Sequence, residues 1–117
     1  MRYYVAWCFV LLLIPLPVFG HVYILECNPE QDAILDAPPE KITITFVGTV
    51  EPVFSKIEVF DSEGNKVSGK KTEFSEDDTV MEVTLKENLN PGKYTVKWAC
   101  MSLDGHKQTG EYSFTLN

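Results

Sequence analysis

Alternation of apolar and polar residues recurs in four stretches of the chain and constrains its fold more than any other feature. A period of two is that of a β-strand with one buried face, and no stretch of the chain sustains helical spacing. We therefore expect an all-β protein. The alternating stretches are residues 41–46, 80–85, 94–100 and 112–116.

Turn signals rich in Asn, Pro, Gly and Asp separate these stretches. Several short antiparallel strands joined by turns predict a β-sandwich, with the stripe that ends in Trp98 packed between its sheets. At 117 residues, the chain has room for one such domain. The turn signals lie at residues 28–29, 37–39, 61–65, 75–78 and 90–92.

The first twenty residues differ from the rest and read as a secretory signal peptide. Arg2 precedes the uncharged run VAWCFVLLLI, and Val18 and Gly20 stand at the −3 and −1 positions of a cleavage site after Gly20. A retained membrane anchor is the alternative, but Pro15 interrupts the run short of the ~20 residues that a spanning helix needs. We expect residues 1–20 to be removed and residues 21–117 to form the mature domain.

The charge of the chain excludes several classes of partner. Ten Lys and Arg residues stand against 17 Asp and Glu, a net charge of −7. Loss of Arg2 with the signal peptide would make it −8. The lysines are scattered along the sequence, which predicts neither a nucleic-acid site nor a basic membrane-surface patch.

The only two histidines stand in contexts suited to metal binding. His21 would be the mature N-terminus, where its α-amine and ring nitrogen can chelate one ion. His106 follows Asp104 and Gly105, and residues two apart face the same way in an extended segment. Three nitrogens and one oxygen suit tetragonal Cu(II) better than calcium or structural zinc. The alternative is that Asp-Gly forms an ordinary turn and both histidines are incidental.

The ordered motifs of the mature chain resemble those of the CopC family of extracytoplasmic copper-binding proteins. That family combines a signal peptide, a mature N-terminal His and a late W-x-x-x-S-x-D-G-H segment, and this chain has all three. The similarity extends over essentially the whole mature chain. The matching segments are 21–25, 28–29, 42–46, 50–55, 91–98, 102–106 and 110–116.

The resemblance implies a small antiparallel Greek-key β-sandwich, cupredoxin-like or immunoglobulin-like, that binds one Cu(II) per chain through His21, Asp104 and His106. It also implies a monomeric, non-enzymatic carrier or buffer in the periplasm or cell-envelope exterior. The implied role is copper homeostasis or resistance, with an inner-membrane copper transporter of the CopD type as partner. Where relatives often carry Ser-Glu, this chain has Val47 and Gly48, so a carboxylate near the metal is missing.

Two other functions fit parts of the sequence. Copper monooxygenases that oxidise polysaccharides also hold copper with an N-terminal His and a second His. In this chain, however, Asp104 would occupy a position that oxygen chemistry should leave open. The remaining alternative is a purely structural sandwich with no copper-dependent stabilisation.

The sulfur-containing residues carry two further expectations. Cys27 and Cys100 are expected to form a disulfide between the first strand and the strand leading into Asp104, with free thiols as the alternative. Met81 is expected in the core, and Met101 on the face opposite Trp98. Two thioethers without a cluster do not predict a Cu(I) site.

Overall fold

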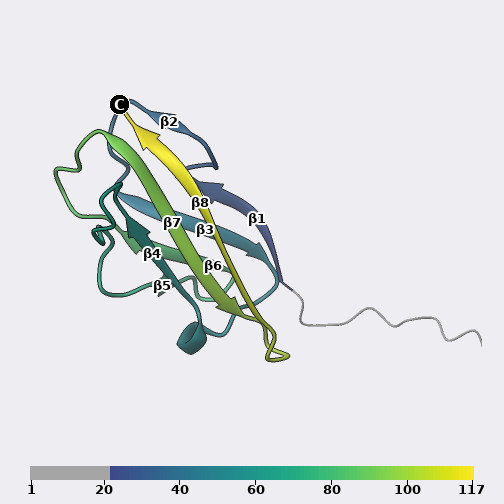
Figure 1. Cartoon of the computed structure of the whole chain (residues 1–117). Helices are drawn as coiled ribbons and strands as arrows, with labels where there is room; N and C mark the ends of the chain where they lie inside the picture. Colours follow the sequence, from purple (N-terminus) through teal and green to yellow (C-terminus); the bar gives the residue numbers. More distant parts are fainter. Residues whose placement is uncertain (1–21) are drawn as a thin grey trace, which may run out of the picture.

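Two four-stranded sheets packed face to face form the protein, as the computed structural model shows for residues 22–117 (Figure 1). One sheet has the order β1-β3-β6-β5 and the other β2-β8-β7-β4. The predicted all-β sandwich is thereby confirmed. The elements are β1 (Tyr23–Asn28), β2 (Ile34–Leu35), β3 (Lys41–Val47), the 3-10 turn η1 (Pro52–Phe54), β4 (Lys56–Phe60), β5 (Glu73–Phe74), β6 (Val80–Thr84), β7 (Gly92–Met101) and β8 (Lys107–Leu116).

The alternating residues face the space between the sheets, as the period of two requires. Ile42 and Ile44 of β3 are fully buried, and so are Val96 of β7 and Phe114 of β8. The predicted core position of Met81 is confirmed, since this residue is also fully buried. Alternation therefore predicted the inner faces of β3, β6, β7 and β8 correctly.

The pairing of the strands is not antiparallel throughout. Ile34 and Leu35 of β2 pair in parallel with the end of β8, whereas every other strand pair is antiparallel. A two-residue strand has no period to read, so the sequence gives no sign of β2 or of β5. The described residues contain no helix long and apolar enough to cross a membrane.

The predicted disulfide is wrong, because Cys27 and Cys100 are both free thiols. Cys100 pairs with Gln108, whose side-chain amide donates a 3.1 Å hydrogen bond to the carbonyl oxygen of Val22. Cys100 therefore lies at the level where the chain enters the sandwich. Cys27 is five residues further along, about 16 Å of strand. A disulfide needs Cα atoms within about 7 Å.

The expected signal peptide, residues 1–20, and the expected ligand His21 lie outside the described residues. The boundary at Gly20 therefore stays a prediction. All residues of the buried core lie between Val22 and Leu116.

Candidate metal centre

The described chain begins at the same end of the sandwich as the loop that carries Asp104 and His106. Val22 is buried and accepts the hydrogen bond from Gln108, two residues beyond His106. Tyr23 then pairs with Val47 at the start of β1. Gln108 was not singled out from the sequence, because its partner lies 86 residues away along the chain.

The loop between β7 and β8 is a tight turn rather than the extended segment that the sequence suggested. The backbone N–H of Ser102 donates to the carbonyl of His106 at 3.0 Å, and that of Gly105 donates to the carbonyl of Ser102 at 3.0 Å. Gly105 has a φ of 85°, a left-handed conformation that favours glycine. The turn folds residues 102–106 back on themselves.

This turn brings the two predicted ligands of the loop together. The Nδ1 atom of His106 lies 2.9 Å from Oδ2 of Asp104. Oδ1 of Asp104 accepts hydrogen bonds from the hydroxyl of Ser102 and, at 3.2 Å, from the backbone N–H of His106. The imidazole is 65% exposed and the carboxylate 22% exposed. The pair is thus fixed in position yet open to solvent on the side of the ring.

The hydrogen bonds also set the charge of the carboxylate. The Ser102 hydroxyl and then the His106 ring stabilise the ionised form and hold the pKa of Asp104 at about 2. Asp104 is therefore an anion at any physiological pH. A negatively charged oxygen beside an exposed ring nitrogen is a suitable half-site for a divalent transition metal.

Ser102 is the functional residue whose role sequence reasoning missed. Its side chain is fully buried and its hydroxyl orients Asp104. The spacing Ser-x-Asp is the only signal in the sequence, and it does not distinguish an orienting hydroxyl from a surface serine. Groups that orient a metal ligand commonly affect affinity nearly as much as the ligands themselves.

The remaining sulfur residues do not add to this half-site. Among residues 22–117, no three His, Cys, Asp or Glu side chains converge on a point that could hold a metal. Cys100 is fully buried, and burial raises the pKa of its thiol. Met101 is only partly buried. A thiolate site for Cu(I) has no support in the described part of the chain.

Gly48 lies at the end of β3, on the side where the chain enters, and its φ of 108° reverses the backbone after Val47. Val47 is 53% exposed. No carboxylate from these two positions faces the Asp104 loop, in line with the departure from the family pattern noted in the sequence.

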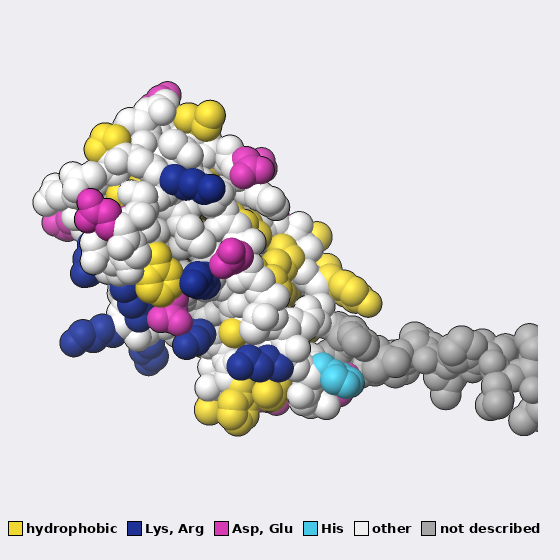
Figure 2. Space-filling view, in the orientation of Figure 1, with side chains coloured by type: hydrophobic (Ala, Val, Ile, Leu, Met, Phe, Trp, Pro, Cys, Tyr) yellow, Lys and Arg dark blue, Asp and Glu magenta, His cyan; other side chains and the backbone are white. Residues whose placement is uncertain are grey.

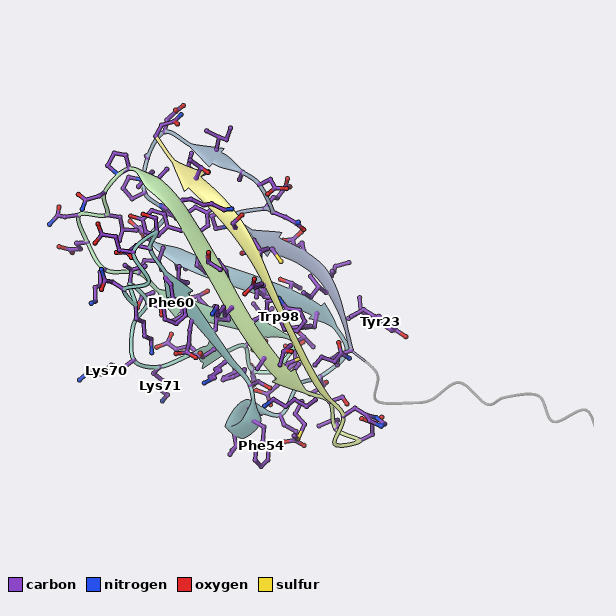
Figure 3. The ribbon with its side chains drawn as sticks, in the orientation of Figure 1. Tyr23, Phe54, Phe60, Lys70, Lys71 and Trp98 are labelled. Carbon is purple, nitrogen blue, oxygen red and sulfur yellow. The ribbon has the colours of Figure 1, made fainter. Side chains whose placement is uncertain are left out.

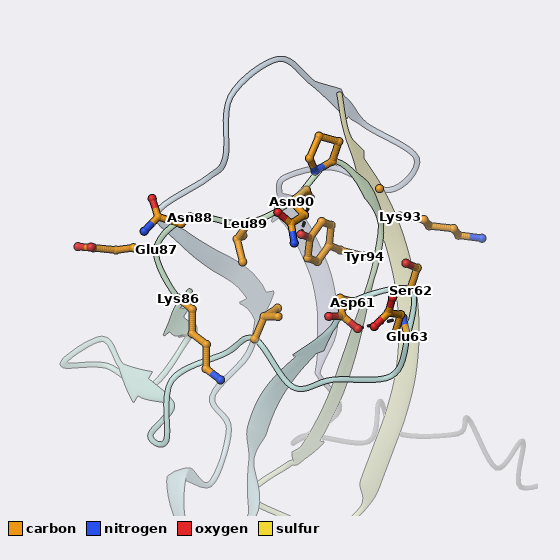
Figure 4. Close-up of a pocket in the computed structure, with 13 residues that line it drawn as sticks. Asp61, Ser62, Glu63, Lys86, Glu87, Asn88, Leu89, Asn90, Lys93 and Tyr94 are labelled. Carbon is orange, nitrogen blue, oxygen red and sulfur yellow. Dashed lines mark hydrogen bonds between the residues drawn. The ribbon is translucent and has the colours of Figure 1, made fainter.

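A second polar cleft lies at the opposite end of the molecule, between the loops at residues 61–65 and 86–93 (Figure 4). Its polar groups already stabilise the two loops. Asp61 accepts hydrogen bonds from the backbone N–H groups of Glu63 and Asn65 at 3.0 and 2.8 Å, and the Tyr94 hydroxyl donates to the carbonyl of Asn90 at 2.6 Å. This cleft is therefore explained by loop structure.

Comparison with known proteins shows the family to which the chain belongs. A family model described as the CopC domain matches residues 24–117. The chain is 33% identical to Protein YobA of Escherichia coli, with 99% of this chain and 94% of that protein covered. It is also 33% identical to the "Copper transport protein CutJ" of Bacillus subtilis over 98% of this chain, but it spans only 21% of the length of CutJ.

Solved structures agree with the sequence relatives. CopC from Methylosinus trichosporium OB3b superimposes with a TM-score of 0.75 at 28% identity, covering 83% of this chain and 94% of that one. PcoC, a methionine-rich copper resistance protein from Escherichia coli, gives a TM-score of 0.71 at 28% identity, covering 84% of this chain and 100% of that one. The chain belongs to the CopC family of copper-resistance proteins.

Proposed function

We propose that the mature chain binds one Cu(II) through the α-amine and ring of His21, the carboxylate of Asp104 and the ring of His106. In this proposal it acts outside the cytoplasmic membrane, in the periplasm or on the cell-envelope exterior. There it would carry or buffer copper without a catalytic step. The signal-like residues 1–20 and the names of the relatives support this location and this cargo.

The spacing of the two loop donors is the observation that carries the proposal. Imidazole nitrogens and carboxylate oxygens lie about 2.0–2.2 Å from a divalent transition metal. Two such donors at right angles about one ion are then about 2.9 Å apart. The distance of 2.9 Å between Nδ1 of His106 and Oδ2 of Asp104 is suited to both atoms binding the same ion with little rearrangement.

The entry of the chain supports His21 as the source of the remaining donors. Val22 is held by Gln108 on the strand that follows His106. Cleavage after Gly20 would leave the amine and imidazole of His21 one peptide bond from this anchored residue. Nitrogen-rich donors with one carboxylate favour Cu(II), which also leads the general affinity order of divalent metals.

A carrier fits the site better than a copper monooxygenase. The Asp104 carboxylate is ionised and hydrogen-bonded in position, so it would occupy a coordination position that oxygen activation requires open. An integral-membrane copper transporter of the CopD type is the proposed partner. The name of CutJ, which describes copper transport in a much longer chain, supports this choice.

The test is titration of the purified secreted form with Cu(II), followed by calorimetry and by native mass spectrometry. We expect one ion per chain and an N-terminus at His21. His21→Ala and His106→Ala should each abolish tight binding, whereas Glu87→Ala, an exposed carboxylate at the opposite end, should bind like the wild type. Wild-type affinity in either histidine variant would show that the assigned site is wrong.

A form with one extra Gly before His21 tests the amine separately. The added residue moves the free amine away from the ring chelate, and affinity should fall by at least a hundredfold. If this form kept wild-type Cu(II) affinity while His106→Ala lost it, the amine of His21 would not be a ligand. Only side chains would then hold the copper.

A further inference from the structure

Four lysines line one groove at the open edge of the sandwich. The groove has a volume of about 520 Å³ and lies between edge strand β4 and the segment 66–72 that leads to β5. Its lining includes Lys56, Lys66, Lys70 and Lys71. The sequence expectation that no basic surface patch exists is therefore corrected, since the segment 66–72 supplies three of these lysines and β4 supplies the fourth.

The positive charge of this groove is only partly neutralised. Glu58 is the one acidic side chain in the lining, and it pairs with Lys56 at 2.9 Å and with Lys66 at 3.4 Å. Lys70 and Lys71 are exposed and have no acidic partner within residues 22–117. A local excess of lysine contrasts with the net charge of −7 on the whole chain.

An apolar tip adjoins the groove. The 3-10 turn η1 projects Val53 and Phe54, which are 85% and 58% exposed, and Val53 also lines the groove. Figure 3 shows Lys70 and Lys71 projecting from the left flank of the molecule and Phe54 from its lower end. In Figure 2, dark blue lysines gather on that flank next to yellow hydrophobic side chains at the lower end.

We propose that this surface, made of the lysines of the groove and the η1 tip, docks the protein on a bilayer that contains anionic lipids. The lysines would contact lipid phosphates, and Phe54 with Val53 would enter the headgroup boundary. Basic residues beside exposed apolar ones are the combination that peripheral membrane proteins use. Glu58 in the groove and Glu51 beside η1 weaken this attraction, so binding is expected at low salt.

The shape of the surface favours a bilayer over a folded acidic protein. Phe54 and Val53 stand on a projecting turn rather than in a cavity that a partner's side chain could fill. Lys70 and Lys71 are not fixed by ion pairs, which suits mobile headgroups better than a partner that requires defined geometry.

Docking on a bilayer would also bring the candidate metal centre close to the membrane. The backbone N–H of Glu51, which precedes η1, donates to the carbonyl of Met101 at 2.8 Å, and Val50 bridges to Ser102. The η1 tip and the Asp104 loop are therefore neighbours. If the proposed copper site is correct, docking places it close to the membrane; the docking proposal itself does not depend on copper.

The experiment is sedimentation of the copper-free secreted form with vesicles at low salt. The vesicles are of phosphatidylcholine alone or of phosphatidylcholine mixed with phosphatidylglycerol. We expect binding to the mixed vesicles only, and its loss at high salt. The double variant Lys70→Glu with Lys71→Glu should reduce the partition coefficient at least about tenfold, since each lysine contributes to attraction at the surface.

Phe54→Ser should reduce binding to the mixed vesicles without changing its dependence on salt. The control is Lys93→Glu, in the cleft at the opposite end, compared with the single variant Lys71→Glu; Lys93→Glu should stay within about twofold of the wild type. Unchanged near-ultraviolet circular dichroism shows that each variant is folded.

Absence of wild-type binding to mixed vesicles would overturn the proposal, and so would an equal loss in the control variant. The protein could instead sediment with native membranes but not with vesicles of pure lipid, and protease treatment of the membranes could abolish this binding. That result would point to a protein partner and would also overturn the proposal. None of these outcomes bears on copper affinity, so the two proposals fail separately.

Discussion

At the scale of single residues, the nitrogen donors rather than the carboxylate of Asp104 should set how copper binding depends on pH. The hydrogen bonds from Ser102 and His106 hold the pKa of Asp104 at about 2, so it remains a ligand far into the acid range. Copper should therefore be released when protons compete for the nitrogen donors, and the release midpoint should shift to lower pH when free Cu(II) is raised. A pH titration followed by the visible copper band at two Cu(II) concentrations measures this shift, and an unchanged titration curve in His106→Ala would contradict ligation by that residue.

The variant Asp104→Asn keeps the shape of the side chain and removes its charge. We expect the Cu(II) affinity of this variant to be at least tenfold lower than that of the wild type. We expect the affinity of Ser102→Ala to be about ten- to a hundredfold lower, because the carboxylate loses its orienting hydroxyl. Competition with a chelator measures both values. Wild-type affinity in Ser102→Ala would show that the hydroxyl has no part in the site.

The same carboxylate affects the stability of the copper-free protein. Because its pKa is lowered on folding, its contribution is present above the ordinary Asp pKa of ~3.9 and is lost as the pH falls through about 2. Urea unfolding should therefore show Asp104→Asn to be less stable than the wild type at pH 7. The difference should shrink in strong acid.

At the scale of elements, Trp98 of β7 lies over Gly110 of β8, its cross-strand partner. A Cβ atom built on Gly110 would lie 2.5 Å from the indole ring, and Phe46 meets the ring edge to face with centroids 6.2 Å apart. Gly110→Ala must push the ring aside, which we expect to cost about 1–3 kcal/mol in the free energy of unfolding.

Urea denaturation with indole fluorescence measures that change and reports the displaced ring directly. Thr109→Ala, an exposed neighbour on the same strand, should change stability by less than about 1 kcal/mol. Equal stability of Gly110→Ala and the wild type would mean that the indole has room to move.

The two cysteines give an element-scale prediction as well. The denatured, unreduced secreted form should show two reactive thiols. The native form should react first at the partly exposed Cys27, while the fully buried Cys100 stays protected. Burial raises the pKa of both thiols, so alkylation of the native protein should speed up with rising pH. If the denatured, unreduced form showed no reactive thiols, the predicted disulfide between Cys27 and Cys100 would be correct after all.

The sequence predicted β3, β6, β7 and β8 well because their burial depends on a local period of two. It missed β4, and it missed β2 and β5, which exist only through pairing with distant strands. It also predicted the meeting of Asp104 and His106, although a turn rather than an extended segment produces it. The contact of Gln108 with Val22 depends on the packing of distant segments and carries no local signal, whereas three of the groove lysines lie together within residues 66–71.

At the scale of the whole molecule, the proposed site would tie the start of the chain to the loop before its last strand. The cargo would then join β1 of one sheet to β7 and β8 of the other. A ligand that binds only the folded state stabilises it in proportion to the logarithm of its concentration over Kd. Copper should therefore strengthen the sandwich as a unit.

We expect saturating Cu(II), at about a thousandfold over Kd, to add about 4 kcal/mol to the free energy of unfolding. For a domain of this size, that gain corresponds to a rise in Tm of about 15–30 °C. Differential scanning calorimetry without Cu(II) and with free Cu(II) at about a thousandfold over Kd measures the rise. The variant His106→Ala should show almost none of it, because the loop then contributes only Asp104. A wild-type rise in that variant would place the stabilising ion elsewhere, and no rise in the wild type would favour a sandwich whose histidines are incidental.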